Sequence, residues 1–73
     1  MTDHGTLIGT VPKTDRAEVR IYRKWHKTRM IIDVRVWWRP DGQTEFVPSR
    51  KGAAFDASKA GLLRLALEEG SIA

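Results

Sequence analysis

In residues 29–39, whose sequence is RMIIDVRVWWR, one set of alternate positions is apolar and the other set carries three arginines and a tryptophan. Successive side chains of a β-strand point to opposite faces, so this spacing predicts a strand with two unlike faces. One face would hold Met30, Ile32, Val34 and Val36. The other would hold Arg29, Asp33, Arg35, Trp37 and Arg39. Guanidinium groups neutralise phosphates and flat rings stack on unpaired bases, so the second face suits single-stranded nucleic acid.

A second strand of the same kind is predicted just before it, over residues 16–25. Val19 and Ile21 alternate there with Arg20, Tyr22 and Lys24, which again separates an apolar face from a basic and aromatic one. Residues 26–28 are a short polar connection. The two strands are therefore predicted to form an antiparallel hairpin.

The rest of the chain must supply the elements that support this hairpin. Asp41-Gly42 predicts a tight turn, and residues 44–47 and 53–55 are predicted as two further short strands. Asp56 is a good N-cap for a helix over residues 57–69. The expected fold class is α+β, with a four-stranded curved antiparallel sheet followed by one C-terminal helix.

The domain boundary and the assembly follow from size and composition. Residues 1–15 are expected to be a flexible leader or a short strand, and residues 16–73 the domain itself. The 73 residues include no cysteine, so no disulfide can add to the stability of a small core. A single helix leaves part of the sheet uncovered, and residues 62–67 make a wide leucine surface on that helix. A homodimer is therefore expected.

Positive charge is concentrated in the predicted sheet. Residues 13–51 hold eleven Lys and Arg residues and five Asp and Glu residues. The remaining residues hold two cations and four anions, so they carry a net negative charge. This distribution is typical of a sheet that meets a polyanion.

The sequence lacks the residues that metal binding, catalysis or membrane insertion would require. With two histidines and no cysteine, neither a metal site nor a cofactor is expected. The serines and threonines have no paired base, so no catalytic residue and no enzyme is expected. No apolar run is long enough to span a membrane, and the amino terminus does not have the layout of a secretory signal. A cytoplasmic, nucleoid-associated protein is expected.

Residues 31–55, IIDVRVWWRPDGQTEFVPSRKGAAF, resemble the single-stranded-DNA-binding domain of the transcriptional coactivator positive cofactor four and its small bacterial relatives. The resemblance lies in the order of Ile32-Asp33-Val34-Arg35, an aromatic pair, a Pro/Asp/Gly turn and Arg50-Lys51-Gly52 before an apolar strand and helix. It implies a dimer that holds unpaired DNA along basic and aromatic strands and acts in transcription, repair or replication. It also implies a strand arginine at Arg35, a stacking ring at Trp38, a basic turn at Arg50 and Lys51, and a hairpin aromatic at Trp25 or His26.

Strict alternation places Trp37, not Trp38, beside Arg35. The role that the resemblance gives to Trp38 therefore requires a β-bulge near the end of that strand.

The predicted binding site combines cations for phosphates with rings for bases. The cations are Arg20, Lys24, Lys27, Arg29, Arg35, Arg39, Arg50 and Lys51. The rings are Tyr22, Trp25, and Trp37 or Trp38. The expected ligand is single-stranded DNA bound without sequence preference, and transcription or replication proteins are further candidate partners.

Three other interpretations stay open. RNA could be the ligand, because stacking and phosphate contacts do not sense the 2′-hydroxyl. The sheet could instead be an adaptor that docks an acidic protein, with the tryptophans as anchors. The arginines could also be ordinary solvated or edge-protecting residues, and one tryptophan is expected in the core.

Overall fold

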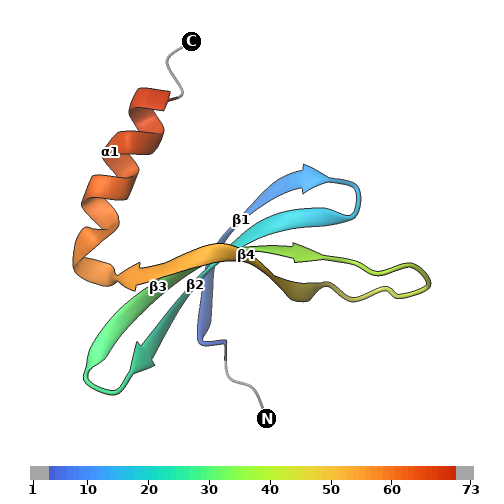
Figure 1. Cartoon of the computed structure of the whole chain (residues 1–73), viewed down its shortest axis with the longest axis horizontal. Coiled ribbons are helices and arrows are strands. Elements are labelled where there is room, and N and C mark those ends of the chain that lie inside the picture. Colours follow the sequence, from blue (N-terminus) through green and yellow to red (C-terminus); the bar gives the residue numbers. More distant parts are fainter. Residues whose placement is uncertain (1–3, 71–73) are drawn as a thin grey trace.

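The computed structural model describes residues 4–70 of the chain, which form one sheet and one helix. Within this range the strands are β1 (Thr6–Thr14), β2 (Ala17–His26), β3 (Arg29–Trp38) and β4 (Val47–Asp56). The 3-10 turn η1 (Ala57–Lys59) and the helix α1 (Ala60–Gly70) follow. Neighbouring strands are antiparallel, and their order in the sheet is their order in the chain (Figure 1). The predicted class, an antiparallel sheet followed by one helix, is confirmed.

Strand β4 differs from the strands expected. The prediction of separate strands at residues 44–47 and 53–55 was wrong, because β4 runs without interruption through Pro48 and Gly52. Pro48 is tolerated because β4 is at the edge of the sheet. Residues 1–15, where a flexible leader or a short strand was expected, contain the nine-residue strand β1, which pairs with β2.

Gly52 marks a close approach of β4 to β3. A Cβ atom at this position would lie 2.5 Å from the carbonyl oxygen of Val34 and 2.7 Å from the Cα of Arg35. A residue without a side chain is therefore required where the two strands meet, and Gly52 does not end the strand.

The central hairpin and the tight turn at Asp41-Gly42 are built as predicted. Lys27 and Thr28 connect β2 to β3, and Lys27 takes a left-handed conformation with φ of 58°. In residues 39–46 the amide of Gln43 donates to the carbonyl of Pro40 at 3.1 Å, and Gly42 has φ of 79°. This is the tight turn expected at Asp41-Gly42.

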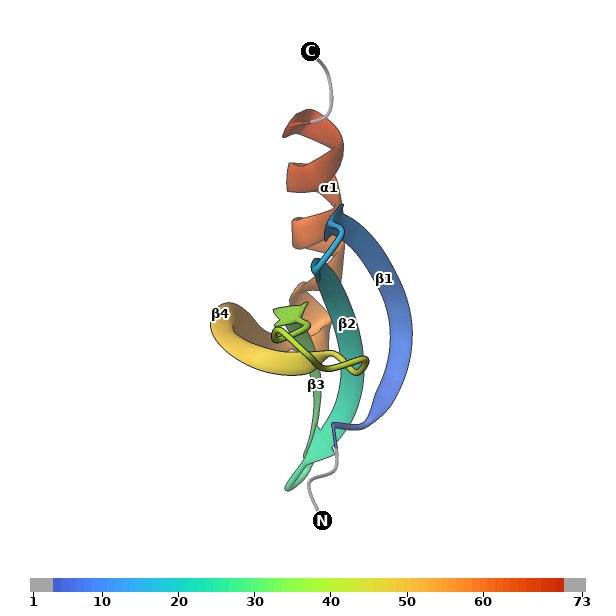
Figure 2. The same cartoon turned by 90° about the vertical axis from the view of Figure 1, so that its right-hand side faces the viewer.

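The helix begins at its predicted cap. The Asp56 carboxylate accepts a hydrogen bond from the amide of Ser58 at 3.0 Å, and this bond lowers the pKa of Asp56 below its ordinary value. The first turn, η1, is 3-10, and α1 then extends beyond the sheet (Figures 1 and 2). As a result Leu62, Leu65 and Leu67 are each more than half exposed. No helix within residues 4–70 is long and apolar enough to cross a membrane.

The molecule is thin and has a very small core. Its principal extents are 39 × 38 × 18 Å. Among the described residues, only Ile32, Asp33 and Trp37 are buried, and no side chain is completely enclosed. The isolated chain therefore buries little apolar surface for its size.

Candidate nucleic-acid interface

The pairing of β2 with β3 sorts the hairpin's side chains into two faces. The register is uninterrupted from Ala17 opposite Trp38 to His26 opposite Arg29, and residues directly opposite each other share a face. The polar face holds Glu18, Arg20, Tyr22, Lys24, His26, Arg29, Asp33, Arg35 and Trp37, together with the apolar Ile31 opposite Lys24. The apolar face holds Ala17, Val19, Ile21, Arg23, Trp25, Met30, Ile32, Val34, Val36 and Trp38. The alternation expected from the sequence is confirmed.

Trp37 is the centre of an aromatic cluster on the polar face. Its ring centroid lies 5.4 Å from that of Tyr22 and 4.9 Å from that of His4, which meets it edge-on. The guanidinium of Arg20 lies 4.6 Å from the same ring. Trp37 is only 5% exposed, and its Nε1 has no hydrogen-bond partner within residues 4–70. Trp37 is thus held by ring contacts and is the tryptophan expected in the core.

Two arginines of the polar face are paired with carboxylates on their own strands. Arg20 Nε donates to Glu18 at 2.6 Å. Arg35 donates to both carboxylate oxygens of Asp33, at 3.0 and 3.2 Å, and this pairing raises the pKa of Arg35. For Arg20, burial disfavours the charge, but hydrogen bonds to Glu18 and Tyr22 outweigh it and raise the pKa. Both guanidiniums therefore stay charged but are locally neutralised.

The polar face is hollowed beside this cluster. A cleft of ≈ 570 Å³, here called the polar cleft, is lined by Trp37 and by the cations Lys24, Arg35 and Arg50. Arg50 is exposed, and Lys24 is half-buried. Because Asp33 also lines this cleft, its field is less positive than the three cations alone would make it.

A second cleft lies on the apolar face, around Trp38. This Trp38 cleft has a volume of ≈ 340 Å³, and Lys13, Lys51, Val36 and Ser49 also line it. Trp38 is 45% exposed, and both lysines are exposed. Within residues 4–70, the only charged residues that line the Trp38 cleft are therefore these two lysines, and the indole ring of Trp38 beside them is accessible to a ligand.

Lys13 was missing from the predicted site. It lies in β1, close to Thr14, which pairs with Ala17, and Ala17 in turn pairs with Trp38. The sequence signal was weak, because Gly9 and Pro12 break the alternation of this strand. The position of Lys13 follows only from the pairing of three strands.

A third cluster of predicted residues lies at the β2–β3 turn. Trp25 is 68% exposed and lines a cleft of ≈ 280 Å³ with Arg23, Lys24 and Met30. Lys27 and Arg29 are exposed on the same turn. This end of the hairpin therefore combines an available ring with cations, and Arg23 is a further residue that the prediction omitted.

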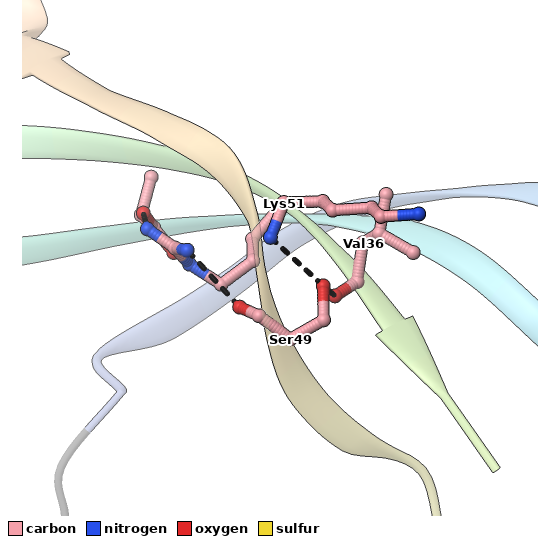
Figure 3. Close-up of polar contacts among 5 residues, drawn as sticks. Val36, Ser49 and Lys51 are labelled. Atoms are coloured by element: carbon pink, nitrogen blue, oxygen red, sulfur yellow. Dashed lines mark hydrogen bonds and ion pairs between the residues drawn. The ribbon is translucent and has the colours of Figure 1, made fainter.

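The β-bulge expected near the end of β3 is not there. The β2–β3 pairing is regular throughout, so Trp38 stays on the face opposite Arg35. The irregularity lies in β4: Gly52 pairs with Arg35, whereas Pro48 pairs with Trp37. Residues 49–51 of β4 therefore lie opposite the single residue Val36, a surplus of two residues in β4, and Ser49 bonds to β3 in this segment (Figure 3).

The predicted residues thus fall into separate groups. Arg20, Tyr22, Arg35, Trp37 and Arg50 lie on or beside the polar face, and Trp38 and Lys51 share the Trp38 cleft. Trp25, Lys27 and Arg29 lie at the β2–β3 turn. Lys24 lines both the polar cleft and the cleft that Trp25 lines at this turn. Arg39 lies in the loop, 5.9 Å from the ring of Phe46, and the guanidinium of Arg20 lies 5.4 Å from the same ring. Among residues 4–70, no group of three His, Asp or Glu side chains could hold a metal ion.

The fold and these clusters define a class of small protein: an antiparallel meander with a C-terminal helix and with cations and indoles at both ends of its hairpin. The structure matches that of BPSL1147, a PC4 (positive cofactor four) homolog from Burkholderia pseudomallei, over nearly the whole chain. In the orthorhombic crystal form the TM-score is 0.85, with 26% identity over 99% of this chain and 96% of that chain. In the tetragonal form these values are 0.81, 28%, 92% and 97%.

The resemblance seen in residues 31–55 is thereby confirmed, and it extends to β1 and the helix. No protein-family model matches the sequence, and no curated protein matches it.

Proposed function

We propose that this chain binds single-stranded DNA without reading base identity and acts in transcription or DNA metabolism. The observation that carries the proposal is the Trp38 cleft, which is lined by an exposed indole together with Lys13 and Lys51. Every base has a flat face, and stacking on such a ring contributes about 1–3 kcal/mol per base whatever the base is. Lysines beside the ring compensate the phosphates of the same nucleotides. The fold shared with a PC4 homolog supports the same function.

Trp25 supports the proposal from the other end of the hairpin. Trp25 and Trp38 are on the same face, and β2 advances eight residues between Ala17, opposite Trp38, and Trp25. At about 3.3 Å per residue, the two rings are separated by roughly 26 Å along the strand. A ligand that contacts both must therefore be an extended chain of several nucleotides.

We also infer that the functional unit is a homodimer. The exposed leucines of α1 and the thin, nearly coreless sheet leave apolar surface that a second copy would cover. Such a cover would add the burial that the single chain lacks.

A fluorescence titration with oligothymidine tests the proposal. The wild-type protein should show quenching of tryptophan fluorescence as the bases stack. Trp38→Leu keeps apolar bulk but removes the ring, and should weaken binding roughly fivefold to 100-fold, as expected for one lost stacked base. Trp38→Phe keeps a smaller ring and should lose less.

The alternatives give different results in the same assay. Equal affinity of folded Trp38→Leu and wild type would exclude Trp38 from the interface. Stronger binding of oligouridine than of oligothymidine would favour RNA. Quenching by polyglutamate but not by oligothymidine would favour the adaptor interpretation and reject the proposal.

A further inference from the structure

Residues 49–51 of β4 divide two neighbouring cations between the faces of the sheet. Gly52 pairs with Arg35 and Pro48 with Trp37, so three residues of β4 lie opposite the single residue Val36. Arg50 lines the polar cleft, while Lys51 lines the Trp38 cleft on the other face. In a regular strand, pairing alone would send two adjacent side chains to opposite faces. In this segment the extra residues leave ladder positions unpaired, so pairing alone does not fix the directions of Arg50 and Lys51.

Ser49 is the residue that ties this segment down. Its hydroxyl donates to the carbonyl of Val36 at 2.7 Å and accepts from the amide of Lys51 at 3.1 Å. Its own carbonyl accepts from Arg35 Nη1 at 3.1 Å. Figure 3 shows Ser49 between Val36 and Lys51, with its hydroxyl bridging the two.

The hydroxyl of Ser49 replaces pairing that the backbone does not provide here. The hydroxyl donates to the carbonyl of Val36 in β3 and accepts from the amide of Lys51 in β4. Backbone carbonyls and amides need hydrogen-bond partners, and the hydroxyl satisfies both of these groups. Ser49 also lines both the polar cleft and the Trp38 cleft, so it stands at the boundary between them. Removal of the hydroxyl would free the backbone at Lys51 without removing any charge.

We propose that Ser49 is a positioning residue of the nucleic-acid interface: its hydroxyl holds the bulge of β4 in the conformation that places Lys51 beside Trp38. The proposal rests on the proposed function, because it concerns how a phosphate-binding lysine is presented to the ligand. Ser49 contributes no charge and acts through Lys51.

Two variants of the same shape separate the hydroxyl from packing. Ser49→Thr keeps the hydroxyl, and Ser49→Val replaces it with a methyl group. We expect Ser49→Val to weaken oligothymidine binding by about fivefold, the effect of one hydrogen bond, and Ser49→Thr to stay within about twofold of wild type. The slope of log affinity against log salt should flatten in Ser49→Val by up to ~0.7, the value for one phosphate contact.

A double-mutant cycle shows whether Ser49 acts through Lys51. If it does, adding Ser49→Val to Lys51→Ala should weaken binding no further than Lys51→Ala alone. Lys59→Ala, which removes an exposed lysine of η1, is the matched control for charge and should leave the Ser49→Val effect intact. Losses that add in the Lys51 cycle would overturn the proposal, as would equal binding of the folded Val and Thr variants.

The failure of this inference is distinguishable from failure of the proposed function. Absence of oligothymidine binding by the wild-type protein would reject both, whereas wild-type binding with an unaffected Ser49→Val variant rejects only the role of Ser49. If Ser49→Val does not fold, hydrogen exchange of the wild-type Lys51 amide decides the geometry. A protected amide is expected from its bond to the Ser49 hydroxyl, and an amide that exchanges as fast as an open loop would overturn the proposal.

Discussion

At the residue scale, the three tryptophans have different surroundings, which indicate which of them stabilise the fold and which can contact a ligand. Trp37 is enclosed by Tyr22, His4 and the guanidinium of Arg20. Trp25 and Trp38 lie at opposite ends of the hairpin with exposed rings. Trp37 therefore serves the fold, and the other two rings are available to a ligand.

We expect Trp37→Ala to lower the free energy of unfolding by about 3–5 kcal/mol, because it empties the centre of the aromatic cluster. Trp38→Ala should cost less than half of that, because the ring is already partly in solvent. Urea unfolding at one fixed protein concentration measures both, since association would otherwise change the apparent stability. Equal losses in the two variants would mean that Trp37 is not the structural ring.

Part of the site could be predicted from residue spacing, and part could not. Asp33 and Arg35 are two positions apart on one strand, so their shared face and their pairing follow from alternation. The same holds for Glu18 and Arg20. The approach of Lys13 to Trp38 could not be predicted, because it depends on the register of three strands rather than on spacing in one.

At the element scale, β2 and β3 were predictable and β1 and β4 were not. The hairpin has unbroken alternation, whereas β1 has register shifts between Leu7 and Gly9 and between Pro12 and Thr14. In β4, Pro48 and Gly52 are residues that usually interrupt a strand. The structure accommodates the first at a sheet edge and requires the second where β4 meets β3.

The close approach at Gly52 makes a specific prediction. Gly52→Ala should destabilise the fold by about 1–3 kcal/mol, because the new methyl group meets backbone atoms that cannot move aside easily. Gly61→Ala is the matched control: nothing lies within 4 Å of its Cβ position, and alanine favours a helix by up to ~1 kcal/mol. Thermal unfolding should give opposite shifts of Tm for the two variants, and a neutral Gly52→Ala would show that β4 lies farther from β3 than described here.

At the scale of the whole molecule, the thin sheet and the extended helix both leave apolar surface unburied in the single chain. The smallest extent is 18 Å, and α1 leaves the sheet after η1 instead of covering either face (Figure 1). The hydrophobic effect scales with apolar area removed from water, so the exposed leucines contribute little in a single chain. The proposed dimer would let the same side chains stabilise the fold.

A pair of glutamine substitutions on adjacent helix positions tests this dimer. Leu65 is more than half exposed and apolar, whereas Arg64 is exposed and lies 3.7 Å from Glu68 in an ion pair. Leu65→Gln should raise the dimer dissociation constant by more than about tenfold, because a symmetric interface loses the burial of two leucines at roughly 1.5–3 kcal/mol each. Arg64→Gln should leave it within about threefold, since surface ion pairs contribute little. Sedimentation equilibrium measures both constants, and circular dichroism checks that each helix still forms. A wild-type chain that stays monomeric at tens of micromolar, or equal effects of the two substitutions, would contradict a dimer formed through this surface of α1.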